Sequence, residues 1–220
     1  MAGTVEEDMH AVETPRLDHT PFYCEENVYL LCKKLSSTGV ANADSSDLFV
    51  IFVSNDRKQI PLWHQKASKS EDGFIVWDYH VICVQRKSGT SCIVWDLDSD
   101  LPFPSPLNFY LSETVRPLSP HLTEYQRLFR VIHAPMFIRS FGSDRRHMKD
   151  SEGNWQAPPP LHDTIVAEDG TVHNLNEYME IRAVDLIVIL DDSVVNGVYS
   201  QKFGIIMGEN QLLEFFSLLP

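Results

Sequence analysis

The chain has 220 residues, a length that fits one large domain or two small ones. Hydrophobic residues make up 43% of it and charged residues 22%, ordinary proportions for a globular protein that argue against disorder over the whole length. The formal net charge of −13 argues against a nucleic-acid binder and against docking on an anionic membrane surface.

The chain start and the cysteines indicate a reducing compartment. The first residues are acidic, whereas a secretory signal or a transit peptide would be basic. No stretch approaches the ~18 apolar residues of a membrane span. The four cysteines contain no C-x-x-C pair and are too few for a disulfide scaffold. We therefore expect free thiols and a location in the cytoplasm and nucleus. We also expect a monomer.

The first predicted element is a helix that follows a polar tail. Residues 1–19 lack period, and we expect a mobile tail there and a single domain over residues 20–220. Thr20 is the predicted N-cap, and Pro21 suits the first turn. Apolar residues then follow at helical spacing: Val28, Leu31, Cys32 and Leu35. Cys24 lies on the same face, in the first turn.

The next apolar runs predict strands. Residues 48–53 are continuously apolar, which is typical of a buried strand. Residues 74–84 form the longest apolar and β-branched run, with both faces apolar, and predict a central strand. A turn at residues 87–90 separates this run from its predicted hairpin partner, residues 91–97.

The second half predicts shorter elements of both kinds. We expect helices at residues 119–129, 136–141, 175–181 and 210–219, extended segments at 130–133 and 198–207, and a strand or buried helix at 184–190. A polar loop rich in basic residues is expected at residues 143–160. The order of these elements predicts an α+β domain with a central, mostly antiparallel sheet flanked by helices.

The predicted hairpin brings a histidine and an aspartate together. A three-residue loop centred on Ser88, with Gly89 in the left-handed conformation, pairs His80 directly with Asp96. Their Cβ atoms would then lie about 5 Å apart on the same face. A four-residue loop would instead turn the two side chains to opposite faces.

Three residues are candidates for nucleophilic catalysis. A helix start favours a thiolate, because unpaired backbone amides stabilise the anion, and Cys24 is the candidate nucleophile. A strand histidine oriented by an aspartate, as in His80 and Asp96, completes the arrangement of a thiol hydrolase. The alternatives are a buried histidine–aspartate pair without catalytic duty and a cysteine that only packs in the core.

Other polar residues carry weaker signals. Three histidines lack the spacing of metal ligands, and we predict no metal site: His147, His162 and His173. The run Arg145-Arg146-His147 is typical of a solvated loop. Trp77 and Tyr79 are expected in the core or in the wall of a pocket beside His80.

Several short motifs occur together in a recognisable order. Residues 77–81 read Trp-Asp-Tyr-His-Val, and further motifs lie at residues 23–27, 54–63, 95–104 and 143–155. From about residue 22 to about residue 178 the sequence resembles the WDYHV-motif family, the protein N-terminal glutamine amidohydrolases. Residues 198–219 resemble the plant members of that family.

The resemblance implies a single catalytic domain with a fold like that of papain and transglutaminase-type thiol enzymes. It implies a triad of Cys24, His80 and Asp96, without metal or cofactor. The implied reaction converts the side-chain amide of an N-terminal glutamine to glutamate and releases ammonia. The implied partners are proteins and peptides with an unblocked N-terminal glutamine, in the N-degron pathway.

Restriction to the first residue of a substrate needs a feature that recognises the free α-ammonium group. A carboxylate is the natural choice, and the candidates are Glu25, Glu26 and Asp78. Trp77 and Tyr79 are further candidates for substrate contacts, and a closed-ended pocket would serve equally. Two other functions stay open at this point: a related thiol acyl-transfer enzyme (a protease or a transglutaminase-like cross-linker) and a non-catalytic module that recognises N-termini.

Overall fold

A six-stranded sheet forms the centre of the fold. The structure, a computed structural model, describes residues 17–87 and 91–219. The sheet order is β6-β5-β4-β1-β7-β8, and every neighbouring pair is antiparallel; β2 and β3 form a separate two-stranded sheet. The strands are β1 (Leu48–Ser54), β2 (Ile60–Leu62), β3 (Ile75–Trp77), β4 (His80–Gln85), β5 (Ile93–Trp95), β6 (Ser105–Pro106), β7 (Leu128–His133) and β8 (Ile205–Met207).

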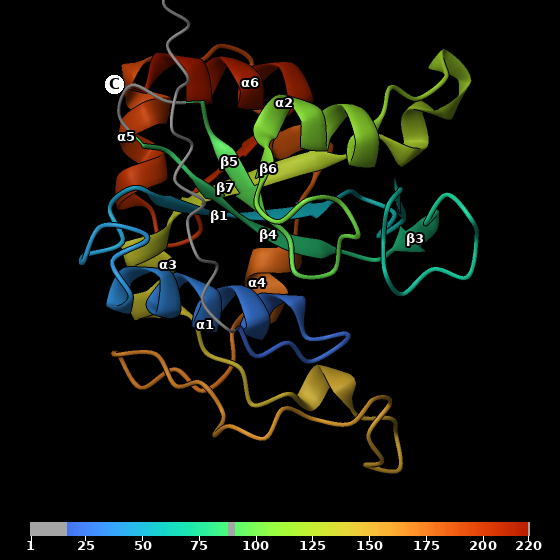
Figure 1. Ribbon diagram of the computed structural model, residues 1–220, viewed down its shortest axis with the longest axis vertical. Helices are drawn as coiled ribbons and strands as arrows, with labels where there is room; N and C mark the ends of the chain where they lie inside the picture. Colours follow the sequence, from blue (N-terminus) through green and yellow to red (C-terminus); the bar gives the residue numbers. More distant parts are fainter. Residues whose placement is uncertain (1–16, 88–90, 220) are drawn as a thin grey trace, which may run out of the picture.

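Helices cover both faces of the large sheet, as Figure 1 shows. One face carries α1 (Cys24–Ser37), α3 (Ala134–Ser140) and α4 (Leu175–Met179), and the other carries α2 (Leu107–Tyr110), α5 (Asp192–Ser200) and α6 (Glu209–Leu218). Short helical turns lie at Leu111–Val115, Pro120–Tyr125, Arg146–Met148 and Ala183–Asp185. The predicted α+β class, with an antiparallel sheet flanked by helices, is confirmed.

The sheet separates two hydrophobic cores. Side chains of β1 alternate between them, because successive residues of a strand point to opposite faces. Val50 and Phe52 pack toward α1 and α3, whereas Phe49 and Ile51 pack toward α6. All seven residues of β1 are buried, so the strand needs an apolar side chain at almost every position.

The predicted strand over residues 74–84 is wrong in one respect: it is two strands. β3 pairs with β2, and β4 joins the large sheet between β5 and β1. The break falls at Asp78, whose side chain accepts a hydrogen bond from the backbone amide of Tyr79 at 2.9 Å. The Ser54 hydroxyl donates to the carbonyl of Asp78 at 2.7 Å. These bonds replace the ladder locally and turn the chain out of the sheet.

The register of the hairpin also differs from the prediction. β4 pairs Cys83 with Trp95 and Val84 with Val94, a shift of two residues from the expected register. The predicted loop at Ser88 and Gly89 lies outside the described residues. Because a shift of two preserves the face of each side chain, the predicted shared face survives, but the two candidate residues lie diagonally rather than directly opposite.

The first helix starts later than predicted. Thr20 is not its cap: α1 begins at Cys24, after Phe22, whose positive φ of 69° is incompatible with a helix. The side chain of Asn27 reaches back and bonds both the amide and the carbonyl of Thr20, at 2.9 and 2.8 Å. Cys24 is therefore the first helical residue rather than a residue further along the first turn.

Three predictions for the second half are wrong. Residues 119–129 form only a short helical turn before β7 begins, and residues 198–207 contain the end of α5 followed by β8. Residues 184–190 are neither strand nor buried helix, and Val184 and Val188 are exposed. The helices predicted at residues 136–141, 175–181 and 210–219 are confirmed as α3, α4 and α6 within a few residues.

The structure describes only the last residues of the predicted tail. Most of the predicted tail lies outside the described residues, and the domain boundary stays a prediction. Within the described part of the tail, Leu17 packs against the core, and His19 donates to Asp98 at 2.8 Å.

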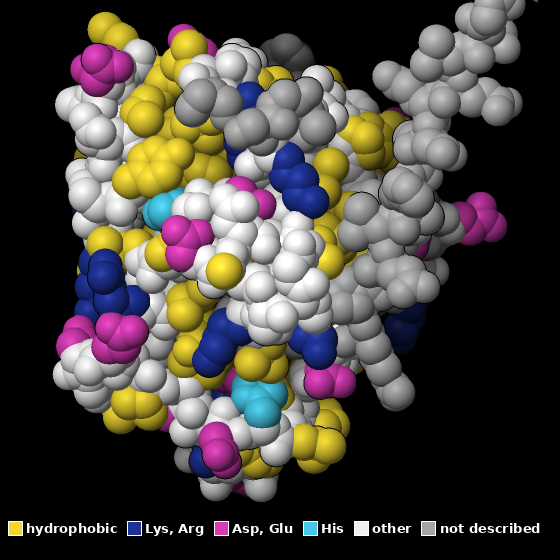
Figure 2. Space-filling model, turned by 60° about the vertical axis from the view of Figure 1, so that its left-hand side comes forward, with side chains coloured by type: hydrophobic (Ala, Val, Ile, Leu, Met, Phe, Trp, Pro, Cys, Tyr) yellow, Lys and Arg dark blue, Asp and Glu magenta, His cyan; other side chains and the backbone are white. Residues whose placement is uncertain are grey.

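The surface in Figure 2 has no single type of charge: basic side chains are dispersed among acidic and hydrophobic ones on the face in view. Within residues 17–87 and 91–219, every helix is too short or too polar to cross a membrane.

Candidate active site

One cavity brings the sequence-predicted residues together. It has a volume of about 320 Å³ and lies where the start of α1 meets the chain segment between β3 and β4. Residues from three further segments complete its wall. The polar and aromatic lining includes Cys24, Trp77, Asp78, His80, Asp98 and His147. The predicted nucleophile and the predicted base therefore face a common space.

His80 and Asp96 form a buried hydrogen-bonded pair. Nε2 of His80 lies 3.0 Å from Oδ1 of Asp96, and neither side chain is more than 2% exposed. Burial alone would lower the pKa of His80, but the charge and hydrogen bond of Asp96 outweigh it and raise that pKa above 6.5. At Asp96 burial raises the pKa, but the charge and hydrogen bond of His80, together with hydrogen bonds from Tyr110 and Asp98, outweigh it and lower that pKa. Since the carboxylate accepts at Nε2, the lone pair of a neutral ring lies on Nδ1.

Asp96 is held by further donors. The Tyr110 hydroxyl of α2 donates to Oδ2 at 2.7 Å, and the backbone amide of Asp98 donates to Oδ1 at 3.0 Å. The side-chain amide of Gln65 lies 3.5 Å from Oδ2. A buried carboxylate with this many donors is stable as an anion, which suits a residue that must orient an imidazole.

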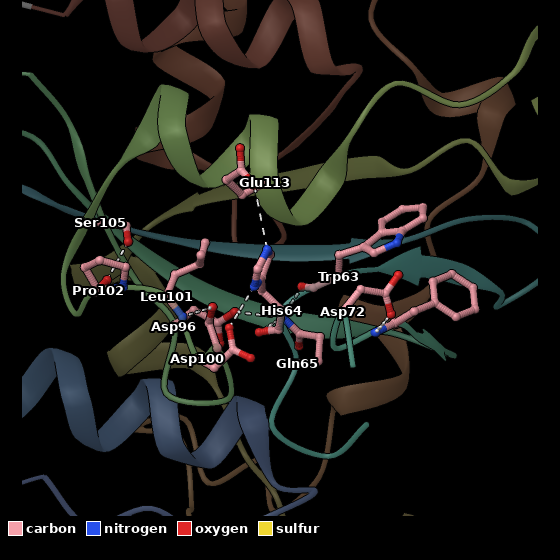
Figure 3. A network of polar contacts seen from close by, with 12 residues as sticks. Trp63, His64, Gln65, Asp72, Asp96, Asp100, Leu101, Pro102, Ser105 and Glu113 are labelled. Carbon is pink, nitrogen blue, oxygen red and sulfur yellow. Dashed lines mark hydrogen bonds and ion pairs between the residues drawn. The ribbon is translucent and has the colours of Figure 1, made fainter. Parts of the chain in front are cut away.

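The loop after β2 fixes the segment that carries Asp96 and Asp98. The amide of Lys66 donates to the carbonyl of Asp98 at 2.8 Å, and the amide of Asp100 donates to the carbonyl of His64 at 3.0 Å. Figure 3 shows the ring of His64 between Asp100 and Glu113, at 2.9 and 3.7 Å. Backbone hydrogen bonds to a neighbouring loop thus position a segment that has no regular secondary structure.

The surroundings of Cys24 disfavour the thiolate form of its side chain. Burial raises the pKa of this thiol well above 9.0, and the negative charges of Glu25, Asp98 and Asp78 raise it further. A hydrogen bond from the backbone of Val81, the residue after His80, acts in the opposite direction. The predicted preference for thiolate at the helix start is therefore outweighed. The sulfur nevertheless lies against the strand that carries His80.

Glu25 lies behind the cavity rather than in its wall. The Tyr79 hydroxyl donates to Oε2 of Glu25 at 2.9 Å, and the Cys24 sulfur lies 3.8 Å from the same oxygen. Nε2 of His147 lies 3.4 Å from the other oxygen. Glu25 is fully buried, and these contacts join the helix that carries Cys24 to the cavity wall. Burial and the charge of Glu25 raise the pKa of Tyr79 well above 10.0, so its hydroxyl stays a donor.

Glu26 forms a structural ion pair. Its carboxylate accepts from Nε and Nη2 of Arg145, at 3.1 and 2.9 Å, and Nε2 of His162 lies 3.4 Å away. Both partners of the ion pair are buried, and neither lines the cavity. The run predicted as a solvated loop is therefore divided: Arg145 is buried, whereas Arg146 is exposed and pairs with Asp144.

Two residues from the Trp-Asp-Tyr-His-Val motif shape the cavity mouth. The ring of Trp77 stacks on His80 with centroids 5.9 Å apart and planes 14° apart. Its indole nitrogen donates to Gln65 at 3.1 Å. Asp78 is exposed at the edge of the cavity. Trp77, Asp78 and Tyr79, the three motif residues predicted as substrate contacts, all line the cavity, and their contacts with a substrate stay a prediction.

Sequence reasoning missed two titratable residues of the cavity wall, Asp98 and His147. For Asp98 a signal was present, since it follows Asp96 by two residues and shares its alternation. His147 belongs to an irregular loop, which no periodicity places. Among the described residues, His80, Asp96 and Asp98 alone form a group compact enough to hold a metal ion. A metal there would have to displace the His80–Asp96 hydrogen bond.

Comparisons with known proteins agree with the motifs. A model of the N-terminal glutamine amidase family matches residues 19–216. The protein N-terminal glutamine amidohydrolase of Arabidopsis thaliana is 54% identical over 222 residues, covering all of both chains. The protein of that name from Oryza sativa subsp. indica is 55% identical over 205 residues, 92% of this chain and 88% of the relative.

An animal relative is less similar. The protein N-terminal glutamine amidohydrolase of Bos taurus is 40% identical over 162 residues, 72% of this chain and 75% of the relative. The higher identity to the two plant proteins confirms the predicted likeness to plant members. Full coverage by a plant relative and the match of the family model lead to one conclusion: the chain belongs to the N-terminal glutamine amidase family.

Proposed function

We propose that the protein hydrolyses the side-chain amide of an N-terminal glutamine, giving N-terminal glutamate and ammonia. The observation that carries the proposal is the buried His80–Asp96 pair, whose imidazole lines the same cavity as the thiol of Cys24. An imidazole braced on one nitrogen leaves the other free to exchange a proton with a thiol. The names of the relatives supply the substrate class.

The first step is attack on the amide carbon. Because burial and nearby negative charges favour the neutral thiol of Cys24, Nδ1 of His80 accepts the thiol proton as the sulfur–carbon bond forms. Asp96 stabilises the imidazolium that results. The amide oxygen becomes an oxyanion and needs hydrogen-bond donors. No side chain caps the start of α1, so the backbone amide of Cys24 is the candidate donor.

The second half of the reaction restores the enzyme. His80 returns its proton to the departing nitrogen, ammonia leaves, and the glutamyl group remains on Cys24 as a thioester. His80 then takes a proton from the water that attacks the thioester carbonyl, and it gives that proton to the departing sulfur, which restores the Cys24 thiol. The sum consumes one water and one amide and yields one carboxylic acid and one ammonia.

The product fits a role at the start of a degradation signal. An N-terminal glutamate carries the acidic side chain that arginylation requires in the N-degron pathway. We infer that the enzyme acts there, in the cytoplasm and nucleus, on proteins whose first residue is an unblocked glutamine.

Mass spectrometry of a matched peptide series tests the proposal. The series has the same sequence with N-terminal glutamine, N-terminal asparagine, internal glutamine or acetylated N-terminal glutamine. We expect the mass gain of replacing NH2 by OH in the first peptide alone, with one ammonia per peptide. The variant C24A, folded as judged by its thermal transition, is expected to release none.

Other outcomes would identify a different enzyme. Cleavage of a peptide bond would indicate a protease, and incorporation of an added amine would indicate a transglutaminase-like enzyme. Binding of glutamine-initiated peptides without ammonia release would indicate a recognition module. Unchanged ammonia release by C24A would remove this cysteine from the mechanism.

A further inference from the structure

We propose that Asp98 binds the α-ammonium group of the substrate and so restricts the reaction to the first residue of a chain. The inference rests on the proposed deamidation of N-terminal glutamine and adds the group that recognises the free terminus. Asp98 was not among the carboxylates that the sequence singled out for this role.

The carboxylate of Asp98 is close to the reacting groups. Asp98 lines the cavity together with Cys24 and His80. One of its oxygens lies within 4.8 Å of a ring nitrogen of His80, and its charge acts on the sulfur of Cys24. A cation bound by Asp98 would therefore lie beside the site of attack.

The surroundings of the Asp98 carboxylate also favour binding of a cation. Its side chain is 9% exposed, and Oδ1 accepts a hydrogen bond from Nε2 of His19 at 2.8 Å. Its backbone is fixed by Asp96 and Lys66. Among the residues that the structure describes, no hydrogen-bond donor reaches Oδ2. A nearly buried carboxylate that lines a cavity, with one oxygen not engaged by a donor of the described residues, binds a cation with little cost of reorganisation.

The size of glutamine requires such a group near the sulfur. Four covalent bonds of about 1.5 Å join the side-chain amide carbon to the α-nitrogen, so the two atoms are at most about 5 Å apart. With the amide carbon at Cys24, the ammonium must lie within a few ångströms of the catalytic residues. Asp98 satisfies this condition.

The other carboxylates fit less well. Glu25 and Glu26 do not line the cavity. Asp78 does, but it is exposed, and one of its oxygens already accepts from the amide of Tyr79 at 2.9 Å. An exposed carboxylate gains little from an ion pair, because water competes for both charges. An internal or acetylated glutamine has a neutral amide at this position and leaves Asp98 without its cation.

A pair of peptides that differ only in the α-ammonium group tests the inference. One begins with glutamine, and the other begins with the desamino analogue, a 4-carbamoylbutanoyl group on the same sequence. The wild-type protein is expected to prefer the first, measured as the ratio of the two kcat/KM values for ammonia release. In D98N this ratio should fall about 10- to 100-fold, as expected for loss of a charged hydrogen bond. The rate on the desamino analogue should change little.

Matched variants separate recognition from structural effects. E124Q, which removes a surface carboxylate that pairs with Arg57, is the control and should keep the wild-type ratio. D78N tests the rival carboxylate at the cavity edge. D98S, which is smaller and uncharged, provides the same test if D98N does not fold, as judged by thermal unfolding. Equal losses on both peptides in the folded variants would mean that Asp98 acts through His80, and this would overturn the inference. Collapse of the ratio in D78N alone would also overturn it.

The wild-type protein distinguishes this inference from the proposed function. Equal activity on the two peptides would overturn the role of Asp98 and leave the deamidation intact. Failure to release ammonia from the glutamine peptide would overturn the proposed function and the role of Asp98 together.

Discussion

Asp96 accepts a hydrogen bond from His80 at 3.0 Å, although the two residues are not paired in the ladder. β5 ends at Trp95, and Asp96 is the first residue beyond it. His80 is the first residue of β4. The pair therefore joins the ends of two neighbouring strands at the edge of the cavity, where an imidazole can be buried on one side and reach a substrate on the other.

The first prediction concerns the tautomer of His80. In D96N the side-chain amide can donate to Nε2, so the ring proton moves to Nδ1 and the base is lost. We expect kcat to fall on the order of 10³- to 10⁴-fold, the range for such a substitution in serine proteases. KM should change little. Steady-state ammonia release, with thermal unfolding to verify the fold, is the measurement.

The control for D96N is Y110F. It removes a donor to the other oxygen of Asp96 and keeps the carboxylate. A loss of less than about tenfold in kcat is expected, since the bond to His80 remains. If both variants lose activity equally, Asp96 serves the packing of α2 rather than the imidazole.

The sequence predicted which two residues pair, but it predicted only part of the geometry between them. Alternation along a strand placed His80 and Asp96 on one face, and this holds for any register shift of two residues. The register itself depends on the loop between the strands, which local sequence does not determine. The break at Asp78 was hidden for a similar reason, because a continuous apolar run does not reveal a side chain that competes for backbone hydrogen bonds.

Local sequence patterns did not place Asp98 and His147, because contacts between distant parts of the chain hold both residues in position. Asp98 owes its position to the loop that carries Lys66, more than thirty residues away in the sequence. His147 reaches the cavity because Arg145 anchors its loop on Glu26 of α1. No spacing within either segment encodes these contacts, whereas the apolar stripe that places Cys24 is entirely local.

The second prediction concerns that anchor. R145M would leave the carboxylate of Glu26 buried without its ion-pair partner, and also leave the carbonyls of Pro160 and His162 without a donor. Removal of one partner of a buried pair costs about 3–5 kcal/mol in the free energy of unfolding. Urea unfolding measures this loss. The neighbouring R146M removes an exposed pair and is expected to unfold like the wild type, so equal losses in the two variants would contradict the assignment.

The third prediction concerns the ring that covers His80. W77A removes the stacked indole, admits water and allows the imidazole of His80 to tilt. Misplacement of a catalytic group by about 1 Å costs on the order of 10²-fold in rate. We therefore expect the loss mainly in kcat. W77F keeps an aromatic ring over His80 but loses the bond to Gln65, and should retain most of the activity. A rise in KM with unchanged kcat would instead assign Trp77 to substrate binding.

The fourth prediction is the pH dependence expected when the free enzyme carries a neutral thiol and a neutral imidazole. The free enzyme is active when His80 has lost its proton and Cys24 has kept it. The pKa of His80 is raised, so kcat/KM should increase with pH through a limb above 6.5. The pKa of Cys24 is raised well above 9.0, so the decrease at alkaline pH should lie beyond that value. An acid limb well below 6.5 would instead indicate a resting thiolate–imidazolium pair.

Removing the charge of Glu25 tests the protonation state of Cys24 independently of the wild-type pH profile. The carboxylate lies 3.8 Å from the sulfur, and its charge raises the pKa of the thiol, as do the charges of Asp98 and Asp78. E25Q should therefore lower the pKa of Cys24, move the alkaline limb to lower pH and speed alkylation by iodoacetamide at neutral pH.

The control E124Q removes a carboxylate that pairs with Arg57 on the surface and should leave the alkylation rate unchanged. Alkylation is followed from about pH 5 to about pH 10, with C24A as the background, because only the thiolate reacts. If E25Q and the wild type share one alkylation profile, the charge of Glu25 does not act on the nucleophile.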